Sequence, residues 1–100
     1  MLSKGQNNKE LQKIKSQVVS ILKKNGIEKA GIFGSFARGE QKKTSDVDII
    51  IKPRKKMGFG FFGIQIELEE KLGKKVDLVT YKGLSPYLKD SILKDEVRLI

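Results

Sequence analysis

Residues 30–51 read AGIFGSFARGEQKKTSDVDIII, and this stretch contains most of what decides the fold. The apolar runs near its two ends predict buried β-strands over residues 29–33 and 46–52. Between them, Gly34-Ser35 is typical of a turn where a strand ends, and a short helix is predicted to open at Ser35. Polar residues 39–45 then form a loop that leads into the second strand.

Three aspartates are placed where they can act together. Asp46 and Asp48 lie two positions apart at the start of the second predicted strand, so their side chains point to the same face. Asp77 lies within a further apolar strand, predicted over residues 75–80. Carboxylates on apolar strands are costly to leave unpaired, and a divalent cation is the usual partner. We expect the three side chains to converge on one or two magnesium ions, an arrangement that assists in-line phosphoryl or nucleotidyl transfer.

The remaining pattern is that of a small α/β domain. Apolar residues at three- and four-residue steps predict a helix on each side of residues 30–51, and Ser85-Pro86 is a typical start for a last helix. The long helix between the second and third strands suits a right-handed crossover, which makes those strands parallel. The first strand is reached by a short connection and is expected to run antiparallel. We therefore predict a small mixed β-sheet with flanking helices, in a single domain over residues 1–100 with a flexible leader at 1–8.

The turn after the first strand has the composition of a phosphate site. Gly34 carries no side chain, so a polyphosphate can approach its backbone closely. Ser35 opens a helix whose free amide groups favour an anion, and its hydroxyl adds a donor. Arg38 follows one turn later and offers a fork of donors to the same anion. Each feature alone has an ordinary structural explanation, but their order and spacing together favour a nucleotide site.

Composition narrows the chemistry. The chain has no cysteine and no histidine, so thiolate and imidazole ligands are excluded and any metal must be bound by oxygen. The net charge of +9 favours anionic partners such as nucleotides, nucleic acid or an acidic protein, although an evenly spread lysine-rich surface also serves solubility. No apolar run is long enough for a signal core or a membrane span, so we expect a cytoplasmic protein without a membrane partner.

The chain resembles the minimal nucleotidyltransferase (MNT) family of the DNA polymerase beta superfamily. The likeness lies in GIFGSFARGE at residues 31–40, TSDVDIII at 44–51 and LGKKVDLV at 72–79. It implies the polymerase-beta-like nucleotidyltransferase fold and magnesium-dependent transfer of a nucleotide from ATP. It also implies roles for the candidate residues: metal binding by Asp46, Asp48 and Asp77, with Asp77 as base, and triphosphate contact by Gly34, Ser35 and Arg38.

Small members of the MNT family resemble antitoxins encoded beside a HEPN-domain ribonuclease toxin. The resemblance therefore implies transfer of AMP to a tyrosine hydroxyl of such a toxin, in a homo- or hetero-oligomer whose partner completes the acceptor site. Two alternatives stay open at this point. One is an antitoxin that acts by binding alone, without essential catalysis. The other is a basic nucleic-acid-binding protein, which predicts strongly salt-dependent binding with no need for magnesium or ATP.

Overall fold

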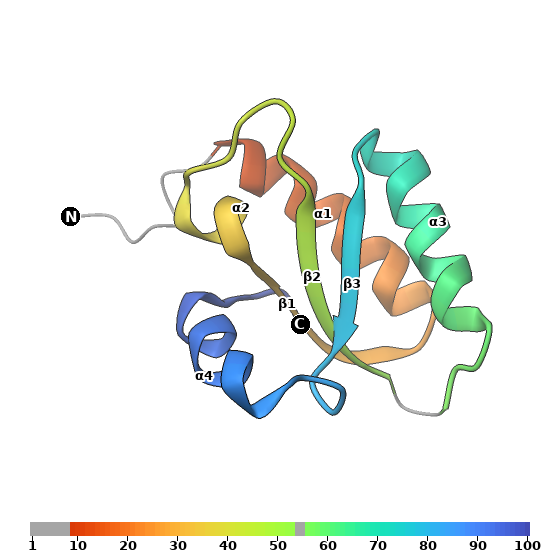
Figure 1. Ribbon diagram of the computed structural model, residues 1–100. Helices are drawn as coiled ribbons and strands as arrows, with labels where there is room; N and C mark the ends of the chain where they lie inside the picture. Colours follow the sequence, from red (N-terminus) through yellow and green to blue (C-terminus); the bar gives the residue numbers. More distant parts are fainter. Residues whose placement is uncertain (1–8, 54–55) are drawn as a thin grey trace.

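The computed structural model describes residues 9–53 and 56–100, and helices and strands alternate along them (Figure 1). The elements are, in order, α1 (Lys9–Lys24), β1 (Ile27–Phe33), α2 (Gly34–Arg38), β2 (Val47–Pro53), α3 (Gly60–Leu72), β3 (Val76–Thr80), α4 (Pro86–Asp95) and β4 (Val97–Arg98). The strands form one sheet in the order β3-β2-β1-β4. β2 and β3 are parallel, whereas β1 is antiparallel to both β2 and β4, so the predicted mixed sheet is confirmed. The leader predicted at residues 1–8 lies outside the described residues.

The predicted helix signals are found where α1 and α3 end and where α4 begins. Gly26 follows α1 and Gly73 caps α3, with φ angles of 75° and 65°, a left-handed conformation that glycine adopts without a steric penalty. At the start of α4, the Ser85 hydroxyl accepts a 3.3 Å hydrogen bond from the Tyr87 amide, and Pro86 occupies the first turn. The apolar stripe of α1 is buried throughout; it consists of Leu11, Ile14, Val18, Ile21 and Leu22.

The two faces of the sheet have different surroundings because side chains alternate along each strand. One face packs against α1 and α3, which contact β1 and β3 respectively, and α1 passes behind the sheet in Figure 1. The strand residues buried in this core are Ile27, Ala30, Ile32, Val47, Ile49, Ile51, Val76 and Leu78. The alternate positions, including Gly31, Asp48 and Asp77, therefore lie on the opposite face, which we call the carboxylate face.

The C-terminal segment borders the carboxylate face. α4 contacts α2 and β1, and β4 pairs with β1 at the edge of the sheet. The Tyr81 hydroxyl donates a hydrogen bond to Glu96, which lies directly over Gly31. A Cβ at Gly31 would lie 2.7 Å from Glu96 Cδ, so the glycine makes room for this carboxylate. Burial and the Glu96 hydrogen bond raise the pKa of Tyr81 well above its usual range, so the phenol stays a proton donor.

Several boundaries differ from the sequence-based expectation by one or two residues; α2 begins at Gly34 instead of Ser35, and β3 begins at Val76 instead of Lys75. β2 begins at Val47, so Asp46 lies just before the strand, because the first backbone pair with β3 is formed by Val47 and Val76. β1 begins at Ile27, two residues earlier than predicted, and Ile27 pairs with Pro53 at an irregularity in the register. Within the described ranges, none of the helices has the length and apolar character needed to cross a membrane.

Candidate functional site

The three predicted carboxylates lie together at one end of the carboxylate face. Asp48 and Asp77 are register partners on the parallel strands β2 and β3, and Asp46 precedes β2 by one residue. Asp46 and Asp48 are half-buried, whereas Asp77 is exposed. The structure therefore brings together the side chains that the sequence pattern grouped, on adjoining segments and not on opposite faces.

Crowding of negative charge is visible in the pKa of Asp48. The pKa of Asp48 is raised from 3.8 to about 6, first by burial of the carboxyl and then by the negative charges of Asp77 and Asp46. A hydrogen bond shared with Asp77 contributes as well, and only Arg38 acts in the opposite sense. An additional positive charge near these groups would favour their ionised forms.

The turn after β1 touches this cluster. Gly34 has a φ angle of 73°, and a Cβ at this position would overlap Asp48 Oδ2 and lie 3.1 Å from Asp48 Cγ. Glycine is required here twice, by the left-handed backbone and by the contact with the carboxylate. The predicted phosphate turn and the predicted metal ligands are thus parts of one site.

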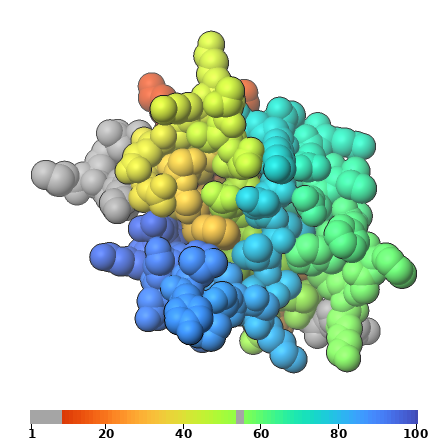
Figure 2. All heavy atoms as spheres, viewed as in Figure 1, coloured from red at the N-terminus to blue at the C-terminus, as the bar shows by residue number. Residues whose placement is uncertain are grey.

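The short helix α2 holds Ser35 at this turn. Phe33 occupies the N-cap position and makes no side-chain cap hydrogen bond. The helix ends at Gly39, where the Glu40 amide donates a 2.9 Å hydrogen bond to the Ser35 carbonyl. Phe36 is fully buried in the core and fixes α2 against the sheet. In Figure 2, viewed from the same side as Figure 1, atoms of α2, β3 and α4 surround the middle of the carboxylate face.

Arg38 has partners that the sequence did not predict. Its Nε donates to Glu40 Oε1 and its Nη1 to Asp95 Oδ2, both at 3.0 Å. These hydrogen bonds raise the pKa of the Arg38 guanidinium above its usual range. Arg38 is close enough to lower the pKa of Asp48, but the N–H groups of Arg38 are directed to Asp95 of α4 and to Glu40 in the loop after α2. Asp95 is 57 residues away along the chain, and no local pattern marks it as the partner of Arg38.

The donor set fits a hard divalent cation. All three candidate ligands are carboxylates, and magnesium prefers oxygen ligands. None of the ion pairs formed among residues 9–53 and 56–100 involves Asp46, Asp48 or Asp77. However, the described residues contain no group of three or more His, Cys, Asp or Glu side chains placed to hold a metal ion, so the three aspartates are neighbours without forming a preassembled metal site.

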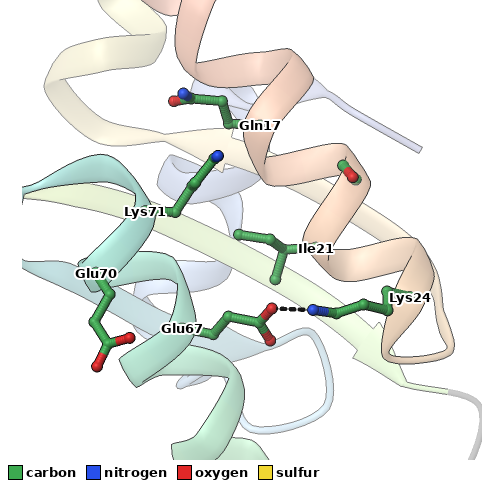
Figure 3. A pocket seen from close by; sticks show the side chains of 7 residues that line it. Gln17, Ile21, Lys24, Glu67, Glu70 and Lys71 are labelled. Atoms are coloured by element: carbon green, nitrogen blue, oxygen red, sulfur yellow. Dashed lines mark hydrogen bonds and ion pairs between the residues drawn. The ribbon is translucent and has the colours of Figure 1, made fainter.

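A groove of about 470 Å³ lies on the opposite side of the sheet, between α1 and α3 (Figure 3). Lys24 and Lys71 line it together with Glu67 and Glu70, and Lys24 forms an ion pair with Glu67. The charges on its walls balance, so the groove offers no concentrated attraction to an anionic nucleotide.

Comparison with known proteins identifies the family. Residues 16–100 match the family model described as "Polymerase beta, Nucleotidyltransferase". The chain belongs to this family. It is 44% identical over 91 residues to a Methanocaldococcus jannaschii protein, MJ0435, provisionally named a protein adenylyltransferase; the match covers 90% of this chain and 98% of that protein. It is 36% identical over 73 residues to protein adenylyltransferase MntA of Thermococcus cleftensis, covering 72% and 74% of the two chains.

Solved structures agree with the family assignment. A minimal nucleotidyltransferase structure superposes with a TM-score of 0.75 at 30% identity, covering 87% of this chain and 90% of that one. A toxin–antitoxin structure with AMP-PNP superposes with a TM-score of 0.77 at 22% identity, covering 86% and 72%. A third contains a tri-AMPylated Shewanella oneidensis HEPN toxin with its MNT antitoxin; the TM-score is 0.71 at 20% identity, covering 89% and 71%. The polymerase-beta-like nucleotidyltransferase fold predicted from the sequence is confirmed, and the protein is a nucleotidyltransferase.

Proposed function

We propose that this nucleotidyltransferase transfers AMP from ATP to a tyrosine hydroxyl of a HEPN-type toxin and thereby acts as its antitoxin. The observation that carries the proposal is the position of Asp48, which lies beside Asp77 and against Gly34. Relatives that share 36–44% of the aligned residues are named protein adenylyltransferases. The structural neighbours include a toxin–antitoxin complex with an ATP analogue and a complex with an AMPylated HEPN toxin, both of which support the same assignment.

The carboxylates and the turn have separate tasks in this proposal. Asp46, Asp48 and Asp77 would hold one or two magnesium ions, which supply charge neutralisation for the triphosphate and the leaving pyrophosphate. The backbone of Gly34 and the hydroxyl of Ser35 bind phosphate oxygens directly. Arg38 adds a charged donor once part of its guanidinium turns from Glu40 or Asp95 toward the phosphates. The protein's own contribution is to align the α-phosphate with the incoming hydroxyl.

The transfer step is a displacement at the α-phosphorus of ATP. The tyrosine oxygen forms a bond to phosphorus, the bond from that phosphorus to the oxygen bridging to the β-phosphate breaks, and pyrophosphate leaves. The phenolic proton passes to Asp77, the exposed carboxylate of the three. The exposure of Asp77 suits this task because the base must be reached by a residue of another protein.

A protein partner also fits the surface next to the site. α4 borders the carboxylate face and contains no buried residue. Tyr87 and Leu88 on this helix are 95% and 55% exposed. Exposed large apolar side chains beside a catalytic face are expected where a second protein completes the acceptor site.

The experiment measures AMP transfer to a candidate HEPN-type toxin protein. The chain is incubated with that protein, magnesium and ATP labelled at the α-phosphate, and the modified residue is identified by mass spectrometry. Asp46→Asn and Asp48→Asn should abolish labelling, whereas Glu70→Gln, on the opposite side of the sheet, should leave it unchanged. Full labelling by either aspartate variant would contradict the site assignment.

A neutralisation assay separates catalysis from binding alone. If Asp46→Asn still binds the toxin but no longer protects cells from it, catalysis is essential. If that variant protects as well as the wild type, the protein is an antitoxin that acts by contact. Binding to nucleic acid that is strongly salt-dependent and indifferent to magnesium and ATP would instead favour the nucleic-acid alternative.

A further inference from the structure

Lys74 lies where the segments that build the site meet. It belongs to the turn between α3 and β3, three residues before Asp77. Its side chain is only 19% exposed, which is unusual for a lysine. Its ammonium group has contacts in three directions, and each contact leads to a different part of the molecule.

The first contact joins the two segments that precede the carboxylates. Lys74 Nζ donates a 3.2 Å hydrogen bond to the carbonyl oxygen of Lys43, three residues before Asp46. The loop that carries Lys43 is a compact turn in which the Lys42 amide donates to Ser45 Oγ at 2.8 Å and the Ser45 amide donates to the Lys42 carbonyl at 3.0 Å. Holding this turn therefore sets the position at which the chain enters β2.

The second and third contacts fix the ammonium itself. Glu10, in the first turn of α1, lies 3.6 Å from Lys74 Nζ and also accepts a hydrogen bond from Gln41 at 3.5 Å. Nζ lies 5.7 Å from the centre of the buried Phe36 ring, which belongs to the helix that follows the Gly34 turn. A cation over an aromatic face is attracted by the ring, most strongly where water is partly excluded.

We infer that Lys74 is a positioning residue that holds the loop before Asp46, the entry to β3 before Asp77 and helix α2 in the arrangement that transfer requires. This inference rests on the proposed function for its kinetic consequences. The Lys74 ammonium contacts Glu10 and a backbone carbonyl, and it forms no ion pair with the three aspartates of the site. The lysine can therefore order the aspartates without neutralising their charge. Surface ion pairs contribute little to folding stability, whereas small misplacements of catalytic groups have large effects on rate.

The test compares Lys74→Met with Lys74→Arg and with a matched control, Lys71→Met. Methionine keeps most of the apolar stem but removes the charge, whereas arginine keeps a charged donor. Lys71 is an exposed lysine in the last turn of α3 and faces the groove on the opposite side of the sheet (Figure 3). We expect Lys74→Met to lower kcat roughly 10- to 100-fold with a smaller change in the KM for ATP, because the alignment of the groups is lost while the Gly34 turn persists. Lys74→Arg should restore most of the rate, and Lys71→Met should retain it.

Amide hydrogen exchange of the free protein provides a readout that does not depend on catalysis. The Val47 amide, between Asp46 and Asp48, donates a 2.9 Å hydrogen bond to the Lys75 carbonyl and reports directly on this junction. Its exchange should become at least about 10-fold faster in Lys74→Met, while amides in the centre of β1 remain protected. Glu10→Gln, which removes one partner of the ammonium, should produce a smaller change in the same direction.

Clear results would overturn the inference. Wild-type exchange at Val47 in Lys74→Met would show that the lysine does not hold the junction, whatever the outcome for transfer. A rate loss shared equally by Lys71→Met would show a general effect of charge. If the wild type transfers no AMP, the proposed function fails, and the exchange measurements still decide the role of Lys74. If Lys74→Met does not fold, the exchange rates of Glu10→Gln and Lys74→Arg decide whether Lys74 holds the junction. Wild-type exchange at Val47 in Glu10→Gln would then refute the positioning role.

Discussion

Replacing Asp48 with asparagine should make the metal-free protein more stable while it abolishes transfer. In the folded protein the pKa of Asp48 is raised from 3.8 to about 6, first because the carboxyl is buried and then because Asp77 and Asp46 are negatively charged. The folded state therefore binds its proton more tightly than the unfolded state does, so stability falls as pH rises through the interval between these values and stays low above it. Asparagine has nearly the same shape and carries no charge, so it removes this cost.

The size of the effect follows from the shift. A difference of roughly two pKa units corresponds to an upper limit of about 3 kcal/mol. Because Asp48 is only half-buried, solvent screens much of this interaction, and we expect a gain of about 1 kcal/mol. For a domain of this size, such a gain raises Tm by roughly 4–8 °C.

The assay is thermal unfolding followed by circular dichroism, in the presence of a chelator. Asp48→Asn should exceed the wild type in Tm at about pH 7.5, and the difference should shrink at about pH 4, where the wild-type carboxyl is largely protonated. Asp90→Asn, an exposed acid on α4, is the control and should show no gain. A loss of stability in Asp48→Asn at both pH values would refute the view that a buried and crowded negative charge destabilises the free protein at this position.

Three further predictions concern the turn, the arginine and the metal. Gly34→Ala should lower the free energy of unfolding, measured by chemical denaturation, by at least about 2 kcal/mol. Gly26→Ala, with a similar φ angle but open space around its Cβ, should lower it by only about 1 kcal/mol. Equal losses would show that the contact with Asp48 does not contribute to the cost. Arg38→Ala should raise the KM for ATP about 10-fold, while Asp95→Asn should not; a similar rise in both would show that Arg38 acts by tying α2 to α4. A chelator should abolish AMP transfer, and added magnesium should restore it. Magnesium should also raise the Tm of the wild type but not that of Asp48→Asn. Transfer that continues without free divalent cations would exclude the proposed metal role.

The local patterns of the sequence were sufficient to place the carboxylates. Alternation along β2 puts Asp48 on the face opposite Ile49, and the length of α3 makes the crossover that sets β3 parallel to β2. Once these two strands are neighbours and parallel, Asp48 and Asp77 can become register partners. The sequence also predicted that the backbone turns at Gly34, because a strand that ends in Gly-Ser is typical of a turn.

The ion pairs could not be predicted in the same way because they depend on tertiary contacts. Lys74 lies only three residues before Asp77 in the sequence. In the structure, Lys74 instead reaches Glu10 at the start of α1 and the carbonyl oxygen of Lys43. Similarly, nothing near Arg38 in the sequence indicates that Asp95, in the last turn of α4, is its partner. Such pairings are decided by how the helices pack on the sheet, and only the folded chain contains that information.

These pairings explain how a protein with a net charge of +9 keeps three aspartates free of ion pairs within the described residues. Two cations close to the site are directed elsewhere: Arg38 pairs with Glu40 and Asp95, and Lys74 pairs with Glu10. An ion pair with Asp48 would lower its pKa and stabilise the free protein, but it would also occupy the oxygens that the proposed magnesium site would use. In the function that we propose, the raised pKa of Asp48 reflects the cost of an arrangement that would become favourable once a divalent cation and a nucleotide bind.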